Sequence, residues 1–233
     1  MSPSPQVTCH DYGDAAVLVD IEGYSYDDRW DVAQRLGRAL PEAGITGLVD
    51  VVSTFQNVVV TFDPLLTDTQ GIRTAILHHA RRPRASRSPR RFAVPAVYGG
   101  EHGPDLAEVA EELSLTPSGL VDLHTSSDWT VRFVGSPVGA PYMDGPSMPS
   151  DVARMRRPRA QVPAGSVALS GRQSVVYPAA SPGGWRLIGR TPVRLFDLDR
   201  EPRTAYVAGD LIRFFAIEAD AWHDHETLVE VRP

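Results

Sequence analysis

The stretch from residue 162 to residue 192 constrains the fold of this chain more than any other segment. It reads VPAGSVALSGRQSVVYPAASPGGWRLIGRTP and holds five glycines and four prolines between short β-branched runs. Glycine permits positive φ and close backbone approach, whereas proline fixes φ and removes a hydrogen-bond donor. The stretch therefore predicts short, tightly turned strands with polar side chains on rigid loops, where binding and catalysis commonly occur. A glycine-rich barrel corner without a site is the alternative.

Composition excludes several kinds of chemistry. All 23 basic residues are arginine, because the chain contains no lysine. A lysine Schiff base, covalent attachment of pyridoxal phosphate or biotin, and a P-loop lysine are therefore impossible within this chain. Cys9 is the only cysteine, which rules out an internal disulfide and a multi-thiolate metal site. No histidine pair has a convincing third ligand, so we expect no metal.

Charge and hydropathy indicate an ordinary soluble protein. The net charge is −6, which gives no electrostatic case for binding nucleic acid or an acidic membrane surface. No apolar run approaches the ~20 residues that span a bilayer, and the first residues lack a basic region followed by an apolar core. We therefore expect a cytoplasmic protein.

The N-terminal part predicts a small α+β sandwich. Residues 15–21 (AAVLVDI) form a valine-rich run typical of a strand, and residues 25–40 have the spacing of a helix. Residues 47–52 and 55–62 indicate two more strands, and a second helical stripe ends near Ala80. The order strand, helix, strand, strand, helix favours one sheet covered by helices.

An arginine-rich segment separates this part from the rest. Residues 81–91 (RRPRASRSPRR) hold six arginines, two prolines and two serines without an apolar pattern. We interpret residues 84–91 as a linker whose charges are solvated. A docking site for an acidic partner or a carboxylate is the alternative.

The C-terminal part predicts a β-barrel. Phe92 to Tyr98 reads as a strand, a short amphipathic helix follows Pro104, and a helical turn begins at Thr116-Pro117 and ends near His124. From Trp129 onward, short strands alternate with Gly/Pro turns, which is the pattern of a closed or nearly closed barrel.

The same blocks resemble a known family. The stretch 162–192 is similar, nearly residue for residue, to the signature of the allophanate hydrolase subunit 1 family, which includes the B subunit of 5-oxoprolinase and the kinase inhibitor KipI. Further matching blocks are Gly13-Asp14-Ala15-Ala16, Phe62-Asp63-Pro64, the run from Val94 to Leu106, Asp122-Leu123-His124-Thr125, Leu195-Phe196 and Ala208-Gly209-Asp210.

The resemblance implies a two-domain α+β architecture. We expect an N-terminal ferredoxin-like domain over residues 1–83 and a C-terminal cyclophilin-like β-barrel over residues 92–217, joined by the linker. Residues 218–233 lie beyond the resemblance, and we interpret them as a strand or an ordered extension.

Two residues are candidates for catalysis. His124 lies beside Asp122, and histidine is the side chain best suited to proton transfer near neutral pH. Gln173 offers an amide donor and acceptor that suit a substrate amide, urea or lactam group. The alternatives are a buried structural histidine and a turn-forming glutamine. The resemblance favours the functional roles.

Four residues are candidates for substrate binding. A guanidinium can hold a carboxylate in bidentate fashion, and an aromatic ring can cover a flat ligand or merely plug the barrel. In the block from Gly135 to Met143, two phenylalanines of the family pattern are replaced by Ser136 and Ala140, from which we expect a wider and more polar pocket. The predicted substrate-binding residues are Arg190, Arg186, Trp185 and Tyr142.

The resemblance implies an enzyme subunit. We expect a heterodimer or heterotetramer with a homologous subunit 2 (the C subunit in 5-oxoprolinases), acting on a C–N bond of a small amide, lactam or urea-like compound at a shared active site. We expect no cofactor in this chain, and any ATP chemistry belongs to partner subunits. A regulatory protein that inhibits a sensor histidine kinase and a repurposed biosynthetic enzyme with an enlarged pocket are the alternatives.

Overall fold

The computed structural model describes residues 6–23, 25–81, 87–136 and 138–231. Contacts divide the chain into two compact units, Met1–Arg87 and Ser88–Pro233. The predicted linker, residues 84–91, spans this division. Its residues 84–86 lie outside the described residues, and its last residue, Arg91, already belongs to a strand of the second unit.

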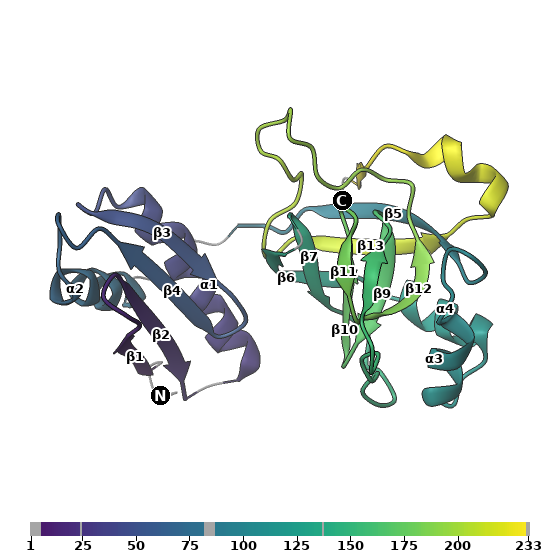
Figure 1. Cartoon of the computed structure of the whole chain (residues 1–233), viewed down its shortest axis with the longest axis horizontal. Coiled ribbons are helices and arrows are strands. Elements are labelled where there is room, and N and C mark those ends of the chain that lie inside the picture. The colour runs from purple at the N-terminus through teal and green to yellow at the C-terminus, as the bar shows by residue number, and fades with distance from the viewer. Residues whose placement is uncertain (1–5, 24, 82–86, 137, 232–233) are drawn as a thin grey trace. The chain divides into compact units, whose positions relative to one another are not determined.

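The N-terminal unit is a four-stranded antiparallel sheet in the order β1-β2-β4-β3, packed against two helices (Figure 1). In β2 the side chains of Val17, Val19 and Ile21 alternate into the core, where Leu36 and Leu40 of α1 also lie. The elements are β1 (Gln6–Asp11), β2 (Ala16–Glu22), α1 (Tyr26–Glu42), β3 (Leu48–Ser53), β4 (Asn57–Phe62) and α2 (Thr69–Ala80).

This sheet is ferredoxin-like with one difference. The segment from β2 to α2 has the predicted order of strand, helix, strand, strand and helix. A ferredoxin-like unit ends with a further strand after the second helix. Here β1, which precedes β2, pairs with the outer edge of β2 instead. The sequence did not predict β1, because only Val7 and Cys9 are apolar in the segment QVTCHD. Both of these side chains are partly exposed in the structure.

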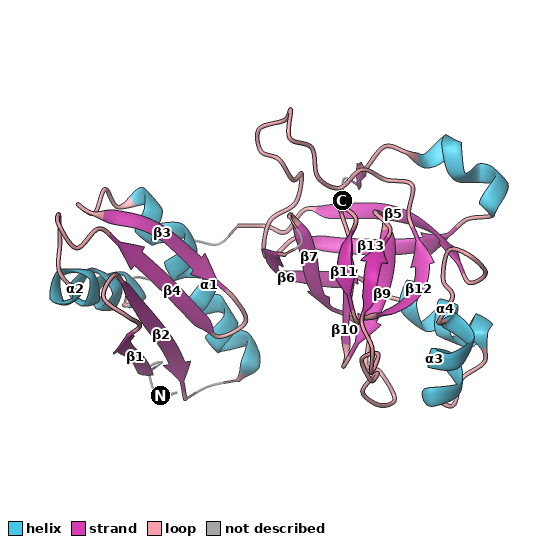
Figure 2. Ribbon diagram, in the orientation of Figure 1, coloured by secondary structure: helices cyan, strands magenta, loops and turns pink. Residues whose placement is uncertain are grey.

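The C-terminal unit is a seven-stranded closed barrel, consistent with a cyclophilin-like fold (Figure 2). The ring closes where β12 pairs with β5, and β5 and β13 form its parallel pair. A short strand, β14 (Val229–Val231), adds to β5. The ring strands are β5 (Arg91–Tyr98), β6 (Trp129–Gly135), β7 (Ala140–Asp144), β9 (Ser166–Ser170), β10 (Gln173–Val176), β12 (Arg186–Arg190) and β13 (Leu211–Ala216).

Two apolar clusters lie on the two faces of the barrel wall. The inner cluster includes Val94, Val131 and Phe214, together with residues of α3 (Leu106–Glu112) and α4 (Pro117–Thr125). On the outer face, a smaller cluster lies near the two-stranded sheet of β8 (Arg159–Val162) and β11 (Ser181–Gly183). Its buried members are Ala140, Val162, Ala168, Val175, Tyr177 and Leu187.

Within the C-terminal extension the structure describes a 3₁₀ helix, η1 (Ala219–His225), followed by β14. Across the described ranges of the chain, none of the helices is long and apolar enough to cross a bilayer.

Close backbone approaches explain two glycines of the predicted turns. A Cβ on Gly103 would overlap the carbonyl oxygen of Ile188 in β12, so any side chain there would push α3 away from the barrel. Gly165 has a φ of +83°, and a Cβ there would overlap the carbonyl oxygen of Thr191. Glycine is required at both positions because the chain turns tightly and the neighbouring backbone is in contact.

Buried carboxylates hold the barrel segments together. Asp105, 6% exposed, accepts hydrogen bonds from Arg159 Nη1 and Nη2 at 2.9 and 2.8 Å and from the Leu187 N–H at 2.7 Å. Asp210, which is fully buried, accepts from the Arg90 N–H at 3.0 Å and from Arg90 Nη2 at 2.9 Å. The bidentate guanidinium at Asp105, and the guanidinium with the backbone N–H at Asp210, satisfy charges that would be costly to bury alone.

These contacts correct one prediction. We expected the arginine run to be solvated, but Arg90 pairs with Asp210, and Arg91 Nη2 lies 2.6 Å from Asp128 Oδ2. The end of the arginine run therefore anchors the first barrel strand.

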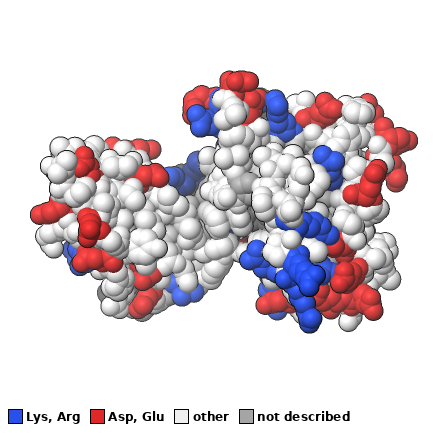
Figure 3. Space-filling view, in the orientation of Figure 1, with Lys and Arg blue, Asp and Glu red and all other residues white. Residues whose placement is uncertain are grey.

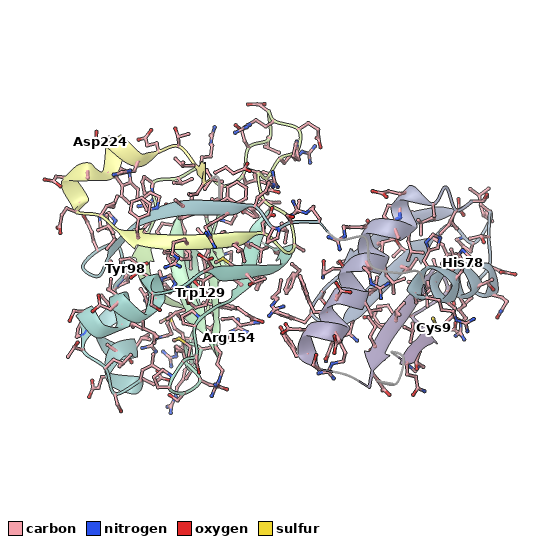
Figure 4. The ribbon with its side chains drawn as sticks, turned by 180° about the vertical axis from the view of Figure 1, so that it is seen from behind. Cys9, His78, Tyr98, Trp129, Arg154 and Asp224 are labelled. Atoms are coloured by element: carbon pink, nitrogen blue, oxygen red, sulfur yellow. The ribbon has the colours of Figure 1, made fainter. Side chains whose placement is uncertain are left out.

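A polar chain crosses the barrel interior. His124 on α4 is 1% exposed; its Nδ1 lies 2.8 Å from the Tyr98 hydroxyl and its Nε2 lies 3.1 Å from the Ser174 hydroxyl. The ring also contacts Trp129 and Phe214. Figure 4 labels Tyr98 and Trp129 on the side of the barrel beside the helices. Burial lowers the pKa of His124 from 6.5 to about 3, so the ring is neutral at physiological pH.

We expect Gly103→Ala to destabilise the barrel by about 3 kcal/mol, because the new methyl group must displace the backbone of β12. Gly100→Ala is the matched control: its φ is +55° and nothing lies within 4 Å of its Cβ, so about 1 kcal/mol is expected. Urea unfolding measures both free energies. Equal losses for the two variants would refute the close approach at Gly103.

We expect His124 to make the stability depend on pH. Below pH 6.5 the His124 ring gains a proton in the unfolded chain, whereas in the folded chain the ring stays neutral until about pH 3. Stability is therefore lost as pH falls through this window, by about 2 kcal/mol at pH 5. Unfolding free energies at pH 7 and pH 5 should differ less in His124→Asn than in the wild-type chain. The same pH dependence in His124→Asn and in the wild-type chain would refute this assignment.

Candidate functional site on the outer face of the barrel

The outer face of β7 and β10 carries a row of polar side chains. Gln173 pairs with Asp144, and Val175 pairs with Tyr142, in an antiparallel register. Alternate residues of a strand share a face, so these four side chains point to the same side of the wall. Gln173 Nε2 donates to Asp144 Oδ1 at 3.0 Å, and Arg132 Nε donates to Asp144 Oδ2 at 2.9 Å. The carboxylate of Asp144 thus holds an amide on one side and a guanidinium on the other.

Aromatic rings continue this row. The Phe133 and Tyr142 rings are stacked with centroids 4.5 Å apart, and Trp185 meets Tyr142 edge-on at 5.7 Å. The Tyr142 hydroxyl donates to the Ser136 carbonyl at 2.6 Å, which fixes the direction of the ring. Tyr142 and Trp185 are both partly exposed and present apolar surface beside the polar row.

Arg154 lies at the edge of the same face. Burial raises the pKa of Tyr142 and of Tyr177, and the positive charge of Arg154 partly offsets the increase in both, so its guanidinium lies within electrostatic range of both hydroxyls. Figure 4 labels Arg154 at the lower end of the barrel, where Figure 3 shows arginine atoms gathered on the surface. Among the residues that the structure describes, no carboxylate lies within ion-pair distance of Arg154, Arg156 or Arg157.

We refer to Arg132, Tyr142, Asp144, Arg154, Gln173 and Trp185 as the outer-face cluster. It combines an amide, a carboxylate, an exposed guanidinium and two rings within one surface. An amide can both donate to and accept from a planar polar group, and an exposed guanidinium can bind an anion. The arrangement suits a small, flat polar molecule that carries a negative charge.

The structure separates the two predicted catalytic residues. Gln173 and Ser174 are neighbours on β10, and neighbouring strand residues point to opposite faces. Ser174 points inward and contacts His124, whereas Gln173 points outward to Asp144. His124 is sealed within the inner core and both its ring nitrogens are engaged. Its geometry favours the structural alternative, and its proton-transfer role stays a prediction.

The four predicted substrate-binding residues divide between two surroundings. Tyr142 and Trp185 are in contact and belong to the outer-face cluster. Arg190 does not: its Nε donates to the Ala164 carbonyl at 2.8 Å, and its guanidinium lies 5.4 Å from the centre of the Trp222 ring on η1.

Arg186 is likewise outside the outer-face cluster. It is 9% exposed, and its Nη2 lies 2.6 Å from Glu108 Oε2 on α3. Its guanidinium therefore pairs with a carboxylate of this chain, so the bidentate substrate clamp stays a prediction for Arg186 as it does for Arg190.

Sequence reasoning missed Asp144, Arg132 and Arg154. A signal existed for Asp144, because it follows Tyr142 by two residues in a short strand and must share its face. Arg132 lies at a register shift between Val131 and Phe133, which no sequence pattern revealed. Arg154 lies in an irregular segment, and its proximity to Tyr142 and Tyr177 depends on the tertiary fold.

The expected widening of the pocket is not found at Ala140. This residue is fully buried in the outer apolar cluster with Val162, Val175 and Tyr177. These neighbouring side chains fill the space around the methyl group of Ala140. Ser136 is exposed, and its carbonyl accepts the hydrogen bond of the Tyr142 hydroxyl, so the changed block supports the ring.

The described part of the chain contains no cluster of side chains that could bind a metal ion. Within these residues, no group of three or more His, Cys, Asp or Glu side chains could hold a metal ion.

Comparison with known proteins places these features in a family. The family model for the carboxyltransferase domain, subdomain C and D, matches residues 7–206. The chain is 35% identical to the B subunit of 5-oxoprolinase from Escherichia coli O157:H7 over 217 residues, covering 88% of this chain and 94% of that protein.

Two further likenesses are informative. The chain is 41% identical to the B subunit of 5-oxoprolinase from Bacillus subtilis over 133 residues, covering 57% of this chain, and the match spans only 55% of that relative's length. The crystal structure of Kluyveromyces lactis urea carboxylase superposes with a TM-score of 0.79, over 98% of this chain and 24% of that one. At 16% identity, this second likeness shows the fold alone.

The family model thus covers the glycine-rich stretch and most of both units. The chain belongs to the carboxyltransferase subdomain C and D family, that of the 5-oxoprolinase B subunit and of allophanate hydrolase subunit 1.

Proposed function

We propose that this chain is one subunit of a heteromeric enzyme that acts on a C–N bond of a small amide, lactam or urea-like compound. Its relatives are named as the B subunit of a 5-oxoprolinase, a name that describes one part of a multi-subunit enzyme. The outer-face cluster forms this chain's share of the active site, and a homologous subunit 2 supplies the rest. ATP, where the reaction needs it, is handled by partner subunits.

The observation that carries this proposal is the hydrogen bond between Gln173 and Asp144 beside the Tyr142 and Trp185 rings. Asp144 accepts one amide N–H of Gln173, which fixes the orientation of the amide group. The second N–H and the carbonyl oxygen of Gln173 make no hydrogen bond to any residue that the structure describes. A fixed amide with a spare donor and acceptor is suited to the complementary pair of a substrate amide or lactam.

The other members of the cluster have complementary roles. Arg154 binds a substrate carboxylate or a developing negative charge, because no carboxylate of the described chain neutralises it. Tyr142 and Trp185 cover the faces of a flat substrate and exclude water from it. Arg132 pairs with the carboxylate of Asp144 and holds it in place. These groups bind and orient, so the groups that move protons come from the partner.

Gln173→Ala should reduce kcat/KM of the assembled enzyme about tenfold or more, because one oriented hydrogen bond to the substrate is lost. The measurement is 5-oxoproline-dependent ATP hydrolysis by the complex purified after co-expression with its homologous partner. Gln161→Ala, an exposed amide on β8, is the matched control and should retain activity. Equal activity in the two variants, with assembly intact, would remove Gln173 from the site.

The same assay separates the two interpretations of His124. Loss of a general acid or base costs at least roughly 100-fold in turnover. If His124 supports the barrel from inside, the folded His124→Asn complex should keep turnover well above that level and should melt at a lower temperature. A folded, fully assembled variant without turnover would instead establish the proton-transfer role.

A further inference from the structure

A pocket of about 340 Å³ lies at the barrel surface between the long loop of residues 191–210 and the C-terminal extension. It shares no residue with the outer-face cluster. Phe92, Leu195 and Leu228 supply apolar side chains to its lining, and the first two are 2% and 3% exposed. The pocket thus combines an apolar floor with walls from two segments far apart in sequence.

The long loop forms a positive wall. Arg194, Arg200 and Arg203 line the pocket, and Asp197 is the single carboxylate among the loop residues that do so. Figure 3 shows positive and negative side chains side by side on the loop that protrudes from the top of the barrel. Among the described residues, none of these three guanidiniums makes an ion pair or a side-chain hydrogen bond. Arg90, which does not line the pocket, has partners, because its guanidinium is bound to Asp210 and to the Ala205 carbonyl.

The C-terminal extension forms a negative wall. Glu226 and Glu230 line the pocket opposite the loop. Glu226 Oε1 lies 3.0 Å from His223 Nδ1, and neither glutamate lies within 4.0 Å of an arginine of the loop among the described residues. This wall lies beyond residues 7–206, the part that matches the family model, so the pocket depends on a segment outside the matched region.

Positive and negative side chains that line one pocket without pairing leave it with charges of both signs available to a ligand. A ligand with one charge would satisfy one wall and be repelled by the other. A zwitterion satisfies both, because its carboxylate binds the guanidiniums and its ammonium binds the glutamates. An apolar substituent then covers the floor formed by Phe92, Leu195 and Leu228.

We propose that this pocket binds a zwitterionic amino acid with an apolar side chain. Its volume accommodates a single amino acid, and its walls carry the two charges that such a ligand requires. The site is independent of the outer-face cluster, so a ligand bound there would act on the subunit without occupying the proposed active site.

The experiment uses the full-length chain and measures binding directly. The twenty standard amino acids are screened at millimolar concentration by thermal shift, and those that stabilise the chain are titrated by calorimetry. We expect at least one apolar amino acid to bind saturably. Its N-acetyl derivative, which lacks the ammonium, and its amide, which lacks the carboxylate, should each bind about tenfold more weakly or worse. An absence of saturable binding across the panel would overturn the proposal.

Variants assign the binding to this pocket. Arg194, Arg200 and Arg203 are replaced by alanine one at a time, and at least one replacement should weaken binding about tenfold; Glu230→Gln should do the same. All four side chains belong to exposed residues, so the variants should fold. Arg172→Ala is the control, because this surface arginine pairs with Asp151 outside the pocket. Affinity unchanged in every pocket variant, or an N-acetyl derivative that binds as well as its parent, would refute the assignment.

Discussion

The carboxylate of Asp105 is the contact on which the barrel depends most. It joins the start of α3, the guanidinium of Arg159 on β8 and the backbone of Leu187 on β12. Removing one partner would leave an uncompensated charge in the interior, which is far more costly than removing the whole group. Through these bonds Asp105 holds β8 close to the barrel wall, and β8 helps to cover the outer apolar cluster beneath Tyr142 and Trp185. A structural ion pair therefore supports the proposed site from behind.

The wall of the barrel divides the polar groups by face. Inward residues form the closed chain of Tyr98, His124 and Ser174, which is neutral and satisfied. Outward residues form an open row with charges and unused hydrogen-bonding capacity. Buried polar groups that satisfy one another specify a packing arrangement, whereas partly exposed ones remain available to a ligand. The division places His124, through Ser174, and Gln173 on opposite faces of β10, so the two predicted catalytic residues cannot act on one ligand from the same side.

Sequence patterns predicted the parts of the fold that depend on local rules. Proline and glycine positions predicted the short strands, and apolar periodicity predicted the helices and strands of the first unit, except β1. For the proposed site, the sequence pointed to Gln173, Tyr142 and Trp185, which the structure brings to one face of the barrel. Arg190 and Arg186 were proposed from the motif alone. Tertiary packing sets their partners, which are the Ala164 carbonyl and the Trp222 ring for Arg190 and Glu108 for Arg186. No local rule reveals which guanidinium finds a carboxylate within its own chain and which, like Arg154, does not.

The parallel pairing of β5 with β13 has a consequence for how the chain is made. The two strands are far apart in sequence, because Arg90 and Asp210, which immediately precede them, are separated by 120 positions. Closing so large a loop is entropically slow, so the barrel cannot close until nearly all of the second unit has left the ribosome. The first unit, whose strands pair with near neighbours in sequence, can fold earlier during synthesis. Until β13 arrives, the edge of β5 is open, and this nascent stage is the one most exposed to aggregation.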